Sequence, residues 1–280
     1  MNTPQQTCPE GEISIRWLGQ SGFYIRTAQA GIVVDAYLST ALEELTRDDP
    51  RCRHVRIYPP MARAEELCPV DVILCTHAHL DHYDRATVQA LFQRNPRAVI
   101  VAPKTMEAQL LRDGFPAQAL RLADVCHTIT EGAVRIDSVP GKHNEFDNPD
   151  PECYPYLGYI ITVGGYRLYH AGDTLLYPQL GDRLAPQQID IAMLPINGYD
   201  QDRIERGFMS NMTCTEAADL ACRIGAKLVI PCHYDMFYIN TEQIGNFVNY
   251  INRAHRQQPY WVPVPGKTFL YPEPKGATNV

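Results

Sequence analysis

The chain has 280 residues, 45% of them hydrophobic, and its 25 Lys+Arg against 32 Asp+Glu give a net charge of −7. This acidic balance argues against nucleic acid as the partner, because nucleic-acid-binding proteins carry a basic surface. No apolar run reaches the roughly 20 residues of a membrane span and no apolar stretch follows a charged N-terminus, so we expect a cytoplasmic protein that is not inserted into a membrane.

The first half of the chain predicts an antiparallel opening followed by alternating strands and helices. We expect strands at 13–17, 22–26 and 31–35, a long loop at 36–70, a strand at 71–75, a helix at 84–92, a strand at 98–102 and a helix at 105–113. Asp84 is placed to cap the first helix. Strands that alternate with helices indicate a partly parallel sheet.

The second half predicts another series of strands and two helices. We expect strands at 124–130, 133–139, 158–163, 166–170, 189–194 and 227–231, an irregular stretch up to Asn211, a helix that begins at Thr213, and a helix at 241–257 before a Pro-rich tail. Gly164-Gly165 is a hairpin signal, and Thr213 with Glu216 forms a capping box. We therefore predict that residues 1–280 form one α/β domain, a four-layer αβ/βα sandwich of two mixed β-sheets with helices outside.

A cluster of three imidazoles and one carboxylate follows the apolar run 72–75, in the order His77-x-His79-x-Asp81-His82. Imidazole nitrogen and carboxylate oxygen are the ligands of Zn, Mn and Fe sites. In an extended loop, side chains two residues apart point the same way, so His77 and His79 would reach one ion. Asp81 and His82 would then reach a neighbouring ion.

Three more residues of the same types follow other predicted strands. They are His143, Asp173 and His233. Because α/β sheets place their binding crevices at the carboxyl ends of strands, we expect these side chains to join the His77–His82 cluster.

Taken in order, these seven residues resemble the metal ligands of the metallo-β-lactamase-fold hydrolases. Within that superfamily, the segments 17–19, 168–173, 197–199 and 230–235 are most similar to the L-ascorbate 6-phosphate lactonase group and more distantly to the N-acylphosphatidylethanolamine phospholipase D group. The resemblance implies one ion held by His77, His79 and His143, a second held by Asp81, His82 and His233, and Asp173 as the bridge between them. The cofactor would be two divalent ions per chain, Mn²⁺, Zn²⁺ or Fe.

The expected mechanism is that of a dinuclear hydrolase. Two Lewis acids about 3.5–4 Å apart lower the pKa of a bridging water, direct the hydroxide at a carbonyl carbon or phosphorus, and stabilise the developing oxyanion. Asp81 would orient the water and pass a proton to the leaving alkoxide. We expect the enzyme to open a lactone or ester, with a sugar-derived lactone, phosphorylated or not, as the leading small-molecule substrate.

Substrate contacts follow less directly from the sequence. Lys142, Arg203 and Arg206 are the candidate cations for a phosphate, and Asn197 is either a donor to the oxyanion or a turn residue. Three further residues are candidates to hydrogen-bond to the metal ligands without touching the ions themselves: Asp35, His170 and Asp235. The loops at 36–70, 144–157 and 197–212 would determine the substrate.

Two other functions remain open at this point. The same metal geometry supports phosphodiester hydrolysis, including that of cyclic phosphates, and a metal-binding scaffold without catalysis is the third hypothesis. The resemblance also implies a homo-oligomer.

Overall fold

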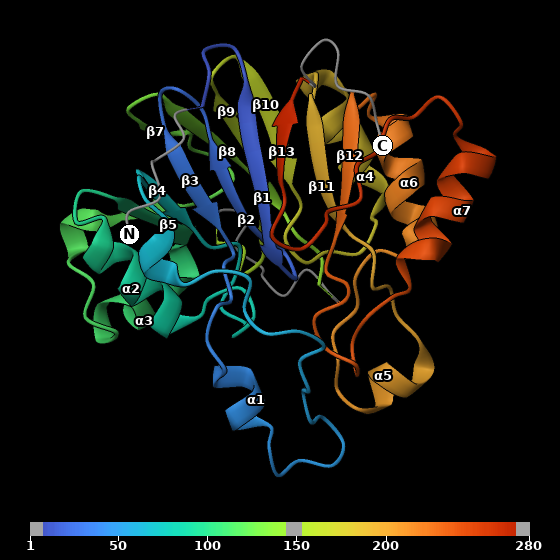
Figure 1. Cartoon of the computed structure of the whole chain (residues 1–280), viewed down its shortest axis with the longest axis horizontal. Helices are drawn as coiled ribbons and strands as arrows, with labels where there is room; N and C mark the ends of the chain where they lie inside the picture. The colour runs from blue at the N-terminus through green and yellow to red at the C-terminus, as the bar shows by residue number, and fades with distance from the viewer. Residues whose placement is uncertain (1–7, 144–152, 273–280) are drawn as a thin grey trace.

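In the described residues, two β-sheets pack face to face and each carries helices on its outer side (Figure 1). The computed structural model describes residues 8–143 and 153–272. The strand order is β13-β1-β2-β3-β4-β5-β6 in the first sheet and β12-β11-β10-β9-β8-β7 in the second. The predicted four-layer α/β sandwich is therefore confirmed.

The first sheet is antiparallel at β13-β1-β2-β3 and parallel from β3 to β6. Its strands are β1 (Ile13–Gly19), β2 (Gly22–Arg26), β3 (Gly31–Val34), β4 (Val72–Leu74), β5 (Val99–Pro103), β6 (Leu120–Ala123) and β13 (Thr268–Tyr271). The helices of this half are α1 (Ala41–Leu45), α2 (Arg85–Arg94) and α3 (Glu107–Arg112). As predicted, the side chain of Asp84 caps α2, accepting a hydrogen bond from the backbone N–H of Ala86.

The second sheet is parallel at β10-β11-β12 and antiparallel from β10 to β7. Its strands are β7 (Ile129–Glu131), β8 (Val134–Pro140), β9 (Leu157–Val163), β10 (Tyr166–His170), β11 (Ile191–Pro195) and β12 (Leu228–Cys232). The helices of this half are α4 (Pro178–Leu184), α5 (Gln201–Glu205), α6 (Cys214–Arg223) and α7 (Ile244–Ala254). Thr213 and Glu216 form the predicted capping box at the start of α6.

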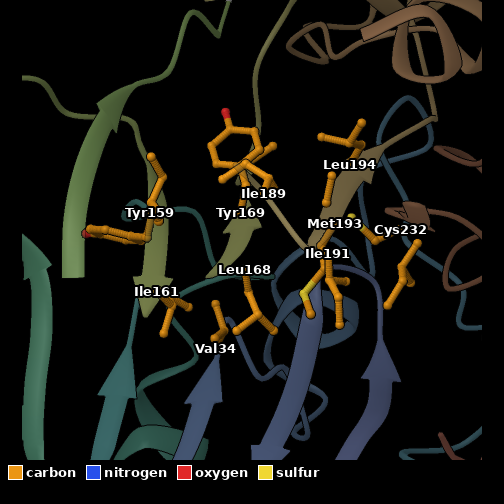
Figure 2. Close-up of a cluster of buried hydrophobic side chains, with 14 of the residues drawn as sticks. Val34, Tyr159, Ile161, Leu168, Tyr169, Ile189, Ile191, Met193, Leu194 and Cys232 are labelled. Atoms are coloured by element: carbon orange, nitrogen blue, oxygen red, sulfur yellow. The ribbon is translucent and has the colours of Figure 1, made fainter. Parts of the chain in front are cut away.

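The main core lies between the two sheets. Val34 of β3 packs there with Ile161 of β9 and Leu168 of β10, all of them fully buried (Figure 2). A second core fills the space between the first sheet and the helices α2 and α3, and it includes Ile73 of β4 and Leu91 of α2. Strands such as β4 are thus covered on both faces, which explains their unbroken apolar sequences.

Some predicted boundaries were wrong for physical reasons. The strand expected at 124–130 is interrupted because the Asp124 carboxylate accepts hydrogen bonds from the backbone N–H groups of Cys126 and His127, which forms a turn. The structure instead has β6 before this turn and β7 after it. The Pro-rich tail contains β13, whose partner β1 lies about 250 residues earlier in the chain.

The first part of the segment 36–70, which contains α1, lies at the end of the molecule where α1 and α5 project beyond the sheets (Figure 1), and its last part packs into the core beside α2. Cys52 Sγ contacts the backbone oxygen of Arg206 at 3.1 Å. Ile57 N–H donates to the backbone oxygen of Met236 at 2.8 Å. The segment is therefore fixed to two other loops. Among the described residues, no helix is long and apolar enough to cross a bilayer.

Candidate metal centre

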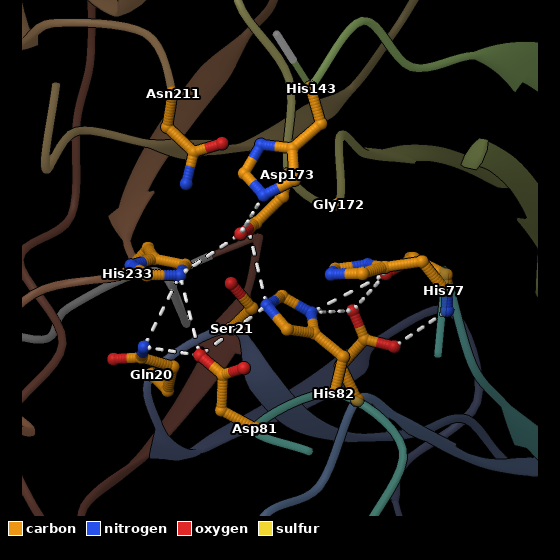
Figure 3. Close-up of polar contacts among 12 residues, drawn as sticks. Gln20, Ser21, His77, Asp81, His82, His143, Gly172, Asp173, Asn211 and His233 are labelled. Carbon is orange, nitrogen blue, oxygen red and sulfur yellow. Dashed lines mark hydrogen bonds and ion pairs between the residues drawn. The ribbon is translucent and has the colours of Figure 1, made fainter. Parts of the chain in front are cut away.

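The structure brings all seven candidate ligands together in two groups, and Figure 3 shows six of them, all except His79. The first group is His77, His79, His143 and Asp173, and the second is Asp81, His82 and His233. Within each group the potential ligand atoms all lie within 4.8 Å of one another. Either group could therefore hold a metal ion.

Strand ends explain this convergence. The segment His77–His82 begins just after β4 in the first sheet, while His143, Asp173 and His233 follow β8, β10 and β12 in the second. The carboxyl ends of these strands meet at one edge of the sandwich. Each group thus takes side chains from both sheets.

Asp173 lies between the two groups. Its Oδ2 is 3.2 Å from His233 Nε2 and 3.6 Å from His143 Nε2, and its Oδ1 is 3.2 Å from His82 Nε2. The preceding Gly172 has φ +59°, and a Cβ there would lie 2.8 Å from Thr76 Cβ and 2.9 Å from Leu157 O. This tight turn needs glycine, and it directs the carboxylate into the centre.

Asp35 supports the centre from behind. It accepts hydrogen bonds from His82 Nδ1 at 2.8 Å, from Thr76 Oγ1 at 2.6 Å and from Thr76 N–H at 2.8 Å. The side chains of Asp35 and His82 are both completely buried. Because the hydrogen bond to Asp35 holds Nδ1 of His82, the other ring nitrogen, Nε2, is directed at the centre.

The donor set fits a cation. His77 Nε2 is buried without a hydrogen-bond partner among the described residues, and His82 Nε2 and Asp173 Oδ1 have only each other, at 3.2 Å and without regular hydrogen-bond geometry. Buried polar atoms are normally satisfied. His143 also uses its Nδ1 elsewhere, as a donor to the backbone oxygen of Ser210 at 2.9 Å. Convergent unpaired nitrogens and oxygens of this kind are expected where a metal ion binds.

The charge states of His77, His143 and Asp173 also suit a cation. Burial lowers the pKa of His77 well below its usual value and that of His143 to about 4, so both imidazoles are neutral near pH 7. Burial acts to raise the pKa of the Asp173 carboxyl, but His233 and His82 outweigh it and hold the pKa well below the ordinary value. Neutral imidazole and ionised carboxylate are the forms that ligate metals. Burial acts to lower the pKa of His82, but Asp173, Asp81 and Asp35 outweigh it and raise the pKa well above its usual value, so a binding ion would displace a proton from this imidazole.

Gln20 is a site residue that the sequence did not reveal. Its Nε2 donates to Asp81 Oδ2 at 2.8 Å and lies 3.2 Å from His233 Nε2 (Figure 3). Gln20 has φ +52° in the turn between β1 and β2, and its backbone oxygen accepts from Trp17 Nε1 and from His233 N–H. A polar residue in a turn at this edge of the sheet is the signal that could have identified it.

A cavity of about 450 Å³ opens beside the centre. It is lined by His79, Asp81, His143, Asp173 and His233, by Leu42, Leu45, Cys52, Ala78, Leu80, Gly207, Phe208 and Met209, and by His54 and Asn240. Among the described lining residues there is no Lys or Arg. The walls away from the candidate ligands are therefore largely apolar.

The residues predicted to contact substrate lie outside this lining. Arg203 and Arg206 pair with Asp200 and Asp202 of their own segment. Asn197 is fully buried, and Lys142 does not line the cavity either. None of these four residues therefore lines the cavity.

The other predicted neighbours have separate roles. His170 Nε2 contacts the backbone oxygen of Ser21 at 2.8 Å, and its Nδ1 accepts from Gly172 N–H. Asp235 N–H donates to Thr241 Oγ1. Residues 144–152 of the predicted substrate loop lie outside the described residues.

Comparison with known proteins agrees with this arrangement. A family model for the beta-lactamase superfamily domain matches residues 31–234. A UPF0173 metal-dependent hydrolase of Methanoculleus marisnigri is 32% identical over 187 residues, 66% of this chain and 75% of the relative. Another from Symbiobacterium thermophilum is 28% identical over 264 residues, 92% of this chain and 99% of the relative.

Two solved structures share the fold. Igni18, a metallo hydrolase from Ignicoccus hospitalis, has a TM-score of 0.67 at 21% identity and covers 93% of this chain and 98% of its own. The isothiocyanate hydrolase from Delia radicum gut bacteria has a TM-score of 0.70 at 18% identity, over 91% of this chain and 98% of its own. The fold is thus the metallo-β-lactamase fold. Since the family model spans most of the chain and a relative more than 30% identical aligns over three quarters of its length, the chain belongs to the UPF0173 metal-dependent hydrolases of the β-lactamase superfamily.

Proposed function

We propose that the protein is a metal-dependent hydrolase that opens a carboxylic ester or lactone with an uncharged, largely apolar body. The apolar lining of the cavity beside the candidate metal centre carries this proposal. Binding pockets of this kind bury an apolar ligand and orient it with a few polar groups.

Two divalent ions are the proposed cofactor, one in each group of ligands, with Mn²⁺, Zn²⁺ and Fe as the candidates because no thiolate is present in either group. Bound there, they would supply Lewis acidity and a nucleophilic water near neutral pH. The residues His77, His79 and His143 would hold one, the residues Asp81, His82 and His233 the other, and Asp173 both.

Asp81 is the proposed proton carrier. Its carboxylate lines the cavity and is held in place by the Gln20 amide. It accepts the proton released when water attacks the carbonyl carbon, and it returns this proton to the leaving alkoxide oxygen as the C–O bond breaks. Gln20 thereby fixes the geometry of the transfer.

The lining disfavours anionic substrates. A phosphorylated sugar lactone, as in the L-ascorbate 6-phosphate lactonase group, would call for Lys or Arg in the pocket, and the described lining has neither. A phosphodiester is also an anion and would likewise call for Lys or Arg in the pocket, so we rank phosphodiesterase activity second. A homo-oligomer is proposed from the family resemblance alone and can be measured by light scattering.

The test compares three probes on purified protein: p-nitrophenyl butyrate, δ-valerolactone and bis-p-nitrophenyl phosphate. We expect hydrolysis of the first two, loss of activity with EDTA and its return with Zn²⁺ or Mn²⁺, and about two ions per chain by elemental analysis. Asp173→Asn should lower the ion content. Absence of a bound transition metal together with chelator-resistant activity would rule the proposal out, and activity on the phosphodiester alone would favour the alternative.

A further inference from the structure

Three asparagine amides form a chain of hydrogen bonds that ends at the pocket. Asn211 Nδ2 donates to Asn197 Oδ1 at 3.0 Å, and Asn197 Nδ2 donates to Asn240 Oδ1 at 3.0 Å. Asn240 lines the cavity beside the metal centre, whereas Asn197 and Asn211 are buried. We call Asn211, Asn197 and Asn240 the amide relay.

Arg203 determines the direction of the amide relay. Its Nη1 lies 3.3 Å from Asn240 Oδ1 and donates to the backbone oxygen of Asn197 at 2.6 Å. A guanidinium can only donate, so the Asn240 atom that faces it must be the carbonyl oxygen. The Asn197 atom that faces the same oxygen must then be the NH₂ group. Because the NH₂ group of Asn197 faces Asn240, the side-chain oxygen of Asn197 faces the NH₂ group of Asn211.

This direction assigns both free ends of the relay. At one end, Asn211 Oδ1 is buried without a partner among the described residues, and Figure 3 shows the amide on the side of the centre where His143 and His233 lie. At the other end, Asn240 Nδ2 makes no hydrogen bond with the described residues. This NH₂ group belongs to a residue that lines the pocket, so it is available to a ligand there.

The surroundings hold the relay in place. Asn197 forms a β-bridge with Thr213, which leads into the capped helix α6. The Arg203 guanidinium is paired with Asp200, which also caps α5 through the Arg203 N–H. The relay is thus anchored on two helix starts, and a side-chain amide fixed in this way loses little entropy when it binds a ligand.

We propose that Arg203 and Asn197 are positioning residues that orient Asn240, and that Asn240 Nδ2 is a hydrogen-bond donor to an oxygen of the substrate. The inference rests on the proposed ester or lactone hydrolysis for the identity of the ligand. It also replaces the expected direct contacts of Asn197 and Arg203 with an indirect role. Asn240 and His54 are then the polar groups that orient an otherwise apolar substrate.

The direction of the relay can be tested without activity. In protein with ¹⁵N-labelled asparagine, we compare solvent exchange of the side-chain NH₂ groups in the wild type, Asn240→Asp, Arg203→Met and Arg206→Met. A carboxylate at position 240 still accepts from both of its donors, so Asn240→Asp should keep the Asn197 NH₂ group protected. Arg203→Met should reduce that protection, and the matched variant Arg206→Met should not. Loss of protection in Asn240→Asp would show the opposite direction and overturn the assignment.

The substrate contact is tested by the kinetics of metal-loaded protein on p-nitrophenyl butyrate and δ-valerolactone. Asn240→Ala and Asn240→Asp should raise KM by about five- to tenfold, since one hydrogen bond to the substrate is lost. Metal content should not change. Arg203→Met should raise KM as well, whereas Arg206→Met and the exposed Asn252→Ala should behave like the wild type.

The two variants at position 240 separate binding from structure. A merely structural Asn240 would tolerate Asp, which preserves both accepted hydrogen bonds, so a wild-type KM in Asn240→Asp would overturn the substrate contact. If the wild type hydrolyses neither probe, the proposed function fails and the contact fails with it. The exchange measurement still decides the direction of the relay in that case.

Discussion

Asp35 Oδ2 accepts a hydrogen bond from His82 Nδ1 at 2.8 Å, and neither side chain is accessible to solvent. This contact selects the imidazole tautomer whose Nε2 lone pair faces the candidate metal centre. Asp35 adopts φ +42° directly after β3, a conformation that Asn also tolerates. The residue can therefore be changed to its amide without disturbing the backbone.

We expect Asp35→Asn to weaken metal binding about 10- to 100-fold. The carboxylate accepts three hydrogen bonds with its two oxygens, and an amide has only one oxygen to offer. A chelator competition titration measures the affinity. The control is Asp71→Asn at the other end of β4, where the carboxylate accepts from Gly31 N–H. Equal affinities in the two variants would contradict the role assigned to Asp35.

Leu45 provides a test of the apolar pocket. It lines the cavity although 71% of it is exposed, so Leu45→Glu should not unfold the protein. In the wild type, each additional buried methylene of a p-nitrophenyl ester should raise kcat/KM roughly fourfold, because it contributes about 0.8 kcal/mol. In Leu45→Glu, kcat/KM should rise much less with each methylene added to the ester. The control is Leu111→Glu, which changes an exposed leucine of α3 that does not line the pocket. In this variant kcat/KM should rise with ester length as it does in the wild type.

His54 should make stability depend on pH. Burial lowers its pKa below 6.5, with Asp81 the main opposing influence, and its ring packs against Phe208 and Phe237. As pH falls below about 6.5, the unfolded chain takes up a proton at His54 before the folded chain does. The free energy of unfolding therefore decreases.

Urea unfolding of metal-free protein at pH 8 and pH 5 checks this. His54→Gln should lose less stability than the wild type between these two values. His127→Gln, at a ring that is 74% exposed, serves as the control and should follow the wild type. A His54→Gln variant with the full wild-type pH dependence would refute the assignment.

Gly172 should be the most sensitive glycine near the centre. An alanine there combines a left-handed φ with contacts under 3 Å to Thr76 Cβ and Leu157 O. Gly165→Ala has a positive φ but no neighbour within 4 Å, so it should cost about 1 kcal/mol, the strain of the left-handed backbone alone. Gly172→Ala should cost more and also lower the metal content, since Asp173 follows it directly. Denaturant unfolding and elemental analysis measure both effects, and equal losses in the two variants would argue against a steric origin.

The positions of the candidate ligands were predictable because strands and the residues after them are local features. His143, Asp173 and His233 each follow a predicted strand, and strands that run in the same direction bring their carboxyl ends together. Gln20 and Asn240 lie in turns, and their place depends on how distant loops pack. That information is not contained in local periodicity.

Charged residues were harder to assign than ligands. Arg203 and Arg206 were expected at the substrate, yet each pairs with an aspartate three or four positions earlier. This spacing is the usual one for ion pairs on a helix. A cation with such a local partner is a weak candidate for substrate binding, because it is already neutralised.

Each group of candidate ligands contains side chains from both sheets, with His77 and His82 following β4 and His143 and His233 following β8 and β12. An ion held by either group would therefore cross-link the two halves of the chain. Separating the sheets would require that ion to be released, so its binding free energy would oppose partial opening as well as global unfolding. Amide hydrogen exchange in β4 and β12 should then slow down together when the protein is loaded with metal, although the two strands belong to different sheets.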